Sequence, residues 1–143
     1  MKFRLFFLLC AIICCGFVRE ARGDIAIIVH KSTQIDTITI SRLIDIYTLN
    51  SKQWKDGSRI SVTDYKGNTE LKVKFYKTMK MTLADMRKIW LRKQFSGKAI
   101  PPKTLASEEA MVEKIASTPG AVGYISSNVA ITEDIRVIAT LHD

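Results

Sequence analysis

The sequence predicts an α/β layered domain with a largely buried sheet, and three observations lead to that fold class. Residues 24–30 (DIAIIVH) form a continuous apolar run, which is typical of a strand covered on both faces. Residues 40–47 and 71–79 instead repeat apolar side chains at helical spacing. Strand-type and helix-type segments alternate along the chain without a linker or repeat, which indicates one domain.

The first half of the predicted domain runs strand, helix, turn and strand. Residues 24–30 are the first strand, and Thr39 is the expected N-cap of a helix over residues 40–47. Asp56-Gly57 marks a turn, and residues 60–65 form the second strand.

The second half contains three more helices and two more strands. Asn68-Thr69 opens one helix, and Thr82 with Asp85 resembles a capping box for the next. Pro101-Pro102 breaks the chain before Ser107 caps a fourth helix. Strands are expected over residues 121–126 and 135–140, the first of them after a turn at 118–120.

The amino terminus has the three parts of a secretory signal peptide. A basic start precedes about 14 apolar residues, and Ala21 and Gly23 provide the small pair before a cut. A membrane-spanning helix needs roughly 20 apolar residues, so a cleaved signal is favoured over an uncleaved anchor. The sequence therefore predicts a signal peptide over residues 1–23, cleavage after Gly23 and a periplasmic domain over residues 24–143.

The three cysteines, Cys10, Cys14 and Cys15, all lie inside this signal segment. Ile13 and Cys14 are poor candidates for the small residue that precedes a lipidated cysteine, so a lipid anchor is not favoured. The mature domain has no cysteine and must be stabilised by an ordinary hydrophobic core. This composition fits a bacterial periplasm better than a disulfide-dense extracellular domain.

The charge of the chain, formally +8, is distributed unevenly. Residues 66–103 hold eleven Lys and Arg against Glu70 and Asp85, and the segment that follows is acidic. Such a region can attract acidic partners. The alternative interpretation is a set of solvated, lysine-rich helix faces.

The sequence offers little for catalysis. Neither His30 nor His142 has a second metal-type ligand at useful spacing, and no Gly-x-Ser-x-Gly, His-Glu-x-x-His or Ser-x-x-Lys motif is present. We therefore expect a protein that is not an enzyme and that has no catalytic residues, no metal site and no cofactor.

The junction between the second strand and its following helix is the predicted ligand site. Lys66, Gly67, Asn68 and Thr69 lie there. A helix N-terminus presents unpaired N–H groups and partial positive charge, Gly67 allows close approach, and Lys66 adds a full charge. The alternative is an ordinary capped turn without a ligand.

Several blocks, in this order, resemble the substrate-binding proteins of phosphate ABC transporters in their short, single-lobe form. They are Trp54-x-Asp56-Gly57, Gly67-Asn68-Thr69, Phe75-Tyr76 and the Pro-Gly-Ala-x-Gly-Tyr block at 119–124. The resemblance covers nearly the whole mature chain. It implies a single αβα-sandwich lobe of the type II periplasmic-binding-protein fold, a phosphate-like oxyanion as ligand, and an ABC transporter or another envelope protein as partner.

The chain also departs from that family. Relatives often show Ser-Gly-Thr where this chain has Gly67-Asn68-Thr69, and they place an arginine just before the loop. Asp64 and Tyr65 stand near that position, and Asp64 would either accept a hydrogen bond from a protonated phosphate or repel the anion.

A single lobe offers only one side of a cleft, so a homodimer that rebuilds both sides is left open. The alternative function is an interaction module that docks an acidic partner through the basic 66–103 region. Nucleic acid is disfavoured because aromatic interleaving of the kind that stacks bases is not evident.

Overall fold

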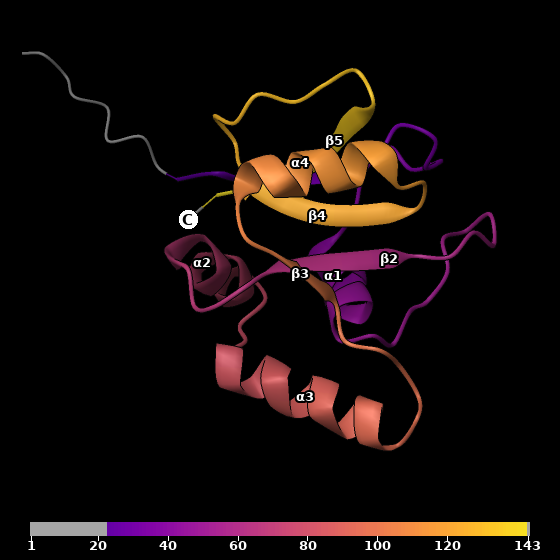
Figure 1. The fold of residues 1–143 in the computed structure, drawn as a ribbon, viewed down its shortest axis with the longest axis vertical. Coiled ribbons are helices and arrows are strands. Elements are labelled where there is room, and N and C mark those ends of the chain that lie inside the picture. The colour runs from indigo at the N-terminus through magenta and orange to yellow at the C-terminus, as the bar shows by residue number, and fades with distance from the viewer. Residues whose placement is uncertain (1–22, 143) are drawn as a thin grey trace, which may run out of the picture.

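The computed structural model describes residues 23–142, which form one mixed α/β unit (Figure 1). The predicted signal peptide and its cysteines lie outside the described residues and stay predictions, apart from Gly23. The elements, in chain order, are β1 (Ile25–His30), α1 (Ile40–Tyr47), β2 (Ser61–Tyr65), α2 (Glu70–Thr78), α3 (Leu83–Phe95), β3 (Lys103–Leu105), α4 (Glu108–Ser117), β4 (Ala121–Ser126) and β5 (Ile135–Leu141).

The five strands form one sheet in the order β3-β2-β4-β1-β5. β2 is parallel to both β3 and β4, whereas β1 is antiparallel to both β4 and β5. β1 is therefore the only strand that runs against the others. The carboxyl ends of β2, β3, β4 and β5 meet at one edge of the sheet, where ligands bind in open α/β folds.

Helices cover both faces of this sheet, as the predicted αβα sandwich requires. On one face α4 lies along β4 (Figure 1), and a Cβ atom on Gly123 would lie 2.5 Å from the Met111 sulfur. On the other face the Phe75 ring stacks on Tyr124 with centroids 3.7 Å apart, and Tyr47 meets Phe75 edge-on at 4.8 Å. The core therefore lies on both sides of β4.

α3 forms an outer layer beyond α1 and α2 (Figure 1). Its Trp90 indole N–H donates to the Tyr47 carbonyl over 2.7 Å, and its Met86 is buried. Trp90 thus packs in the structure rather than standing free for a ligand.

The predicted helix starts are confirmed. A cap depends on residues within one turn of the helix, so the local sequence is enough to predict it. Thr39, Thr69, Thr82 and Ser107 each accept a hydrogen bond from the backbone N–H three residues on. Thr82 and Asp85 form the full capping box.

Strand β3 was not predicted, since the sequence indicated only a break at Pro101-Pro102. It is three residues long and mostly exposed, so it has no recognisable apolar pattern. It forms because its backbone pairs in parallel with β2, from Thr63 opposite Lys103 to Tyr65 opposite Leu105.

The Gly120 turn ties the region before β2 to the start of β4. Gly120 has a φ of 79°, and a side chain there would collide with the Arg59 carbonyl group. The buried Trp54 side chain donates to the Gly120 carbonyl over 3.0 Å. This contact explains structurally why a tryptophan turn and a Pro-Gly turn occur together in the sequence.

Within residues 23–142, no helix has both the length and the apolar character needed to cross a membrane.

Candidate functional site

The four predicted ligand residues lie together in the loop between β2 and α2, at the carboxyl edge of the sheet. All four are exposed. The Lys66 N–H donates to the Leu105 carbonyl over 2.9 Å, which anchors the loop to the end of β3. Gly67 adopts a φ of 70°, and the Thr69 hydroxyl accepts from the Lys72 N–H at 3.2 Å, which caps α2.

Three backbone donors in this loop are unused. Within the described chain, the N–H groups of Gly67, Asn68 and Thr69 donate no hydrogen bond to protein. The first N–H groups of a helix lack intrahelical partners and carry partial positive charge. The loop can therefore donate several hydrogen bonds to an anion.

The charge around this loop is mixed. Glu70 follows at the first helical position and pairs with Lys74 over 3.2 Å. On the neighbouring α4, Glu108 accepts from the Ser126 N–H at 2.9 Å and from its hydroxyl at 2.6 Å. The helices on either side of the loop in the chain and in the fold, α2 and α4, thus each carry a carboxylate in their first turn, which weakens the local positive potential.

Asp64 lies beneath the loop and is fully buried. Its carboxylate accepts hydrogen bonds from the hydroxyls of Tyr124 and Tyr76, at 2.5 and 3.0 Å, and from the Tyr65 N–H at 2.8 Å. The Lys72 amino group stands 3.2 Å from the same carboxylate and donates to the Tyr65 carbonyl. Of the two expectations for Asp64, a direct hydrogen bond from a protonated phosphate is wrong, because the carboxylate is buried and its oxygens are occupied inside the core.

The tyrosines around Asp64 are held in their protonated form. Burial, followed by the nearby Asp64 charge, raises the pKa of the Tyr76 and Tyr124 hydroxyls well above the ordinary value. Both hydroxyls therefore donate to the carboxylate at neutral pH. This hydrogen-bond network joins α2, β2 and β4 beneath the loop.

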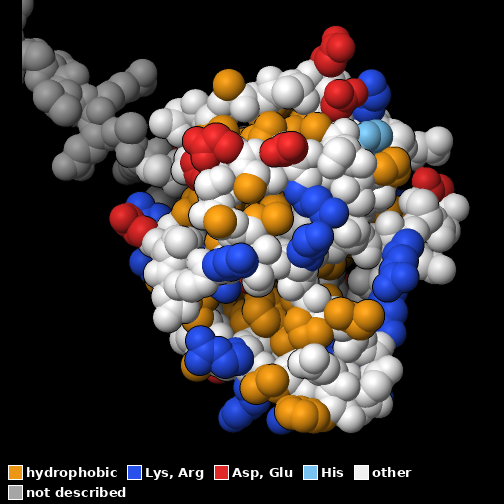
Figure 2. Space-filling model, in the orientation of Figure 1, with side chains coloured by type: hydrophobic (Ala, Val, Ile, Leu, Met, Phe, Trp, Pro, Cys, Tyr) orange, Lys and Arg blue, Asp and Glu red, His pale blue; other side chains and the backbone are white. Residues whose placement is uncertain are grey.

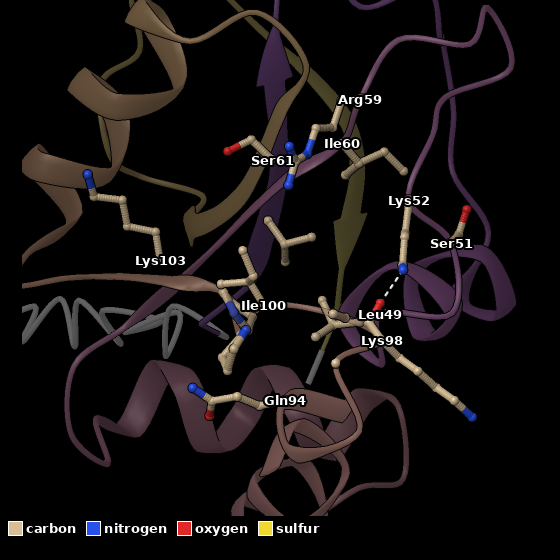
Figure 3. Close-up of a pocket in the computed structure, with 15 residues that line it drawn as sticks. Leu49, Ser51, Lys52, Arg59, Ile60, Ser61, Gln94, Lys98, Ile100 and Lys103 are labelled. Atoms are coloured by element: carbon tan, nitrogen blue, oxygen red, sulfur yellow. Dashed lines mark hydrogen bonds between the residues drawn. The ribbon is translucent and has the colours of Figure 1, made fainter. Parts of the chain in front are cut away.

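A hollow of about 710 Å³ lies at the opposite, amino-terminal end of β2 (Figure 3). Segments 49–62 and 94–103 form its walls, and we call it the basic groove. It is lined by four cations (Lys52, Arg59, Lys98 and Lys103), by apolar side chains (Leu49, Ile60, Val62, Ala99, Ile100, Pro101 and Pro102) and by Ser51, Ser61, Gln94 and Gly97.

Figure 3 shows how these cations are arranged. The Arg59 guanidinium points into the groove near Ser61, while Lys98 and Lys103 extend away at opposite rims. The Lys52 amino group donates to the Lys98 carbonyl and so bridges the two walls. None of these lining residues is acidic.

Sequence reasoning missed the basic groove. Lys52 and Arg59 lie outside the predicted basic region, which contributes only Lys98 and Lys103 to the lining. The other lysines and arginines of residues 66–103 are spread over α2, α3, the turn between these helices and the 66–69 loop. No local pattern could have found a groove whose two walls are about 40 residues apart in the chain.

The fold is similar to that of two crystallised proteins of phosphate transport. One is described as a phosphate ABC transporter substrate-binding protein from Clostridium perfringens, solved with bound phosphate (TM-score 0.65, 17% identity over 80% of this chain and 43% of that chain). The other is an ABC-type phosphate transport receptor from Vibrio cholerae (TM-score 0.62, 18% identity over 80% of this chain and 44% of that chain).

These likenesses support the resemblance seen in the sequence and establish the fold. The chain spans less than half the length of either protein. No protein-family model and no curated sequence matches it.

Proposed function

We propose that this chain is a solute-binding-type protein of the periplasm that binds a small oxyanion such as phosphate at Lys66, Gly67, Asn68 and Thr69. In this proposal residues 1–23 are a signal peptide cleaved after Gly23, and residues 24–143 form the binding lobe. The fold it shares with phosphate-binding proteins supports this role.

The three unused N–H groups of Gly67, Asn68 and Thr69 carry the proposal. A desolvated oxyanion needs several converging donors, and backbone N–H groups at a helix start provide them without a change of shape. Lys66 adds the only full positive charge in the loop itself. The role is binding, and no chemical step is assigned to any residue.

A lobe that contacts an anion from one side leaves the remaining oxygens of the anion in water. We therefore expect a weak affinity for the anion. A second surface would strengthen binding by surrounding the anion. An ABC transporter, another envelope protein or a second copy of the chain are the partners that this role implies.

The test is a phosphate titration of the chain exported by a bacterial host with its own signal sequence. The intact mass shows whether the purified protein begins at Asp24. Phosphate at about ten times its Kd is expected to stabilise the protein by about 1.4 kcal/mol, with chloride at equal ionic strength as reference. Thermal melting followed by tryptophan fluorescence measures the shift.

Lys66→Glu is expected to abolish this shift, because it places a carboxylate beside the free N–H groups. Lys55→Glu makes the same charge change on an exposed turn and should leave the shift intact. A melting temperature that responds equally to phosphate and chloride would refute the oxyanion role.

A second candidate role is a docking module that keeps the scaffold and binds an acidic partner. The observation that favours it is the basic groove, where four cations line one hollow and none of the lining residues is acidic. This role does not require an anion at the 66–69 loop.

A further inference from the structure

We propose that the basic groove is a docking site for an extended acidic peptide segment of a partner protein, with an apolar side chain of that segment seated on the groove floor. The inference specifies the docking role proposed above and is independent of the oxyanion site. The groove combines unpaired positive charge, an apolar lining and an open sheet edge beside it.

The cations of the groove are not neutralised by the protein itself. In the described part of the chain, Lys52, Arg59, Lys98 and Lys103 form no ion pair with a carboxylate. Figure 2 shows acidic side chains gathered over α4 in the upper half of this face, while Lys and Arg surround an apolar area in the lower half.

Neighbouring lysines repel one another at the groove mouth. Burial, followed by the charges of Lys52 and Lys98, lowers the pKa of Lys93, which donates to the Asn50 side chain. An anionic segment in the groove would relieve this repulsion, and its attraction would be largest at low salt.

The apolar part of the lining calls for more than a small anion. Ile60 is buried at the floor, whereas Ile100 lines the same hollow with 77% of its surface exposed. A large exposed apolar side chain beside cations fits a partner that carries both an apolar anchor and acidic residues. No aromatic residue lines the groove, so it lacks the stacking platform that single-stranded nucleic acid uses.

The edge of the sheet favours an extended peptide. Lys103 lines the groove and begins β3, which is the outermost strand on that side. Among the described residues no strand pairs with the outer edge of β3. A peptide that leaves the groove can therefore continue along β3 by pairing with its free backbone groups.

The experiment measures binding of a fluorescein-labelled peptide, Glu-Glu-Asp-Leu-Val-Asp-Glu-Glu, to the purified chain by fluorescence anisotropy. Arg59→Glu and Lys52→Glu are each expected to weaken binding about 10-fold or more, since each replaces a cation of the groove lining by an anion. Lys77→Glu and Lys88→Glu change the net charge equally on exposed helix surfaces and should weaken binding by less than about 3-fold.

The apolar anchor is tested separately. Ile100→Ser should weaken binding about 5-fold or more, whereas Val137→Ser, at an exposed position on β5, should have no effect. A second peptide has Gly-Gly in place of Leu-Val and so lacks the apolar anchor. It should bind the unaltered chain about as weakly as the original peptide binds Ile100→Ser.

The outcomes separate the proposals. An equal loss of peptide affinity in all four lysine and arginine variants would overturn the groove as the docking site. The peptide would then bind only through the net charge of the chain. No peptide binding at low salt would overturn the docking role as well, and neither result bears on phosphate at the 66–69 loop. Tighter binding to anionic lipid vesicles or single-stranded DNA, with the same dependence on Arg59, would overturn the acidic peptide as occupant.

Discussion

The two ends of β2 show two different ways to meet an anion. At the carboxyl end, the full charge of Asp64 is buried and paired, and the loop above it offers mainly backbone N–H groups. At the amino end, four cations surround an apolar floor without a carboxylate among them. Backbone donors fixed by a helix suit one small oxyanion, whereas cations on flexible side chains suit a longer acidic ligand.

The ends also differ in what holds them together. The carboxyl end depends on a buried polar network, in which each hydrogen bond supports the next. The amino end depends on a tight turn, where Gly120 lies against the Arg59 carbonyl group. Changes that damage one end should therefore leave binding at the other end intact in the folded molecules.

High pH should cause the largest loss of stability at the carboxyl end of β2. The pKa of four tyrosines is raised, first by burial, so their contribution is complete below pH ~10, the unfolded value, and is lost as the pH rises above it; they are Tyr47, Tyr65, Tyr76 and Tyr124. Each should remove about 1.4 kcal/mol per pH unit, or about 5–6 kcal/mol together by pH ~11. Urea unfolding across this range measures the loss, and Tyr124→Phe should reduce its slope by about one quarter.

Asp64→Ala should destabilise the protein by about 3–5 kcal/mol, because it leaves Lys72 and two tyrosine hydroxyls without their partner. Urea unfolding at neutral pH measures the change. Tyr76→Phe removes one hydrogen bond from the same network and should cost only about 1 kcal/mol. The refolded fraction should bind the acidic peptide with unchanged Kd, and a large loss there would show that the ends are coupled.

Gly120→Ala should cost about 3 kcal/mol, since a Cβ there meets the Arg59 carbonyl and the φ is positive. Gly97→Ala is the matched control: its φ is also positive, but the space around it is open, so about 1 kcal/mol is expected. Thermal and urea unfolding give both values. Similar costs at the two glycines would contradict the close contact at Gly120.

The smallest expected effect is at the α2 cap. Thr69→Ala should cost about 1 kcal/mol through the lost hydrogen bond to the Lys72 N–H. Thr82→Ala removes the corresponding cap of α3 and is the control for stability. Urea midpoints should fall alike in the two variants, and acidic-peptide affinity should be unchanged in both. Weaker peptide binding in Thr69→Ala alone would place the peptide at the carboxyl end of β2 and so contradict the proposed groove at the amino end.

Much of the fold was predictable because it depends on local rules. Helix caps act within one turn of the chain, and a continuous apolar run indicates a buried strand wherever it occurs. The Pro-Gly-Ala-x-Gly-Tyr block was informative for a similar reason. Gly120 and Gly123 allow close approach of other segments, and the Tyr124 hydroxyl donates to Asp64. The residues of this block are therefore required by the packing of the fold.

The ligand residues were harder to predict, because packing residues do not identify a ligand. The structure confirms that Lys66, Gly67, Asn68 and Thr69 share one loop at a helix start, and their use for an oxyanion stays a prediction. The role of Asp64 was not predictable. Its partners Tyr76 and Tyr124 lie 12 and 60 residues away in the chain, and only folding brings them to its carboxylate.

The sequence alone determined the helices and their caps, the strands other than β3 and the class of fold, since each follows from side chains close together in the chain. The tertiary structure decided three other features: the short strand β3, the burial of Asp64 and the basic groove. Each depends on segments that are distant in sequence, and burial or mutual repulsion arises only once the sheet has brought those segments together.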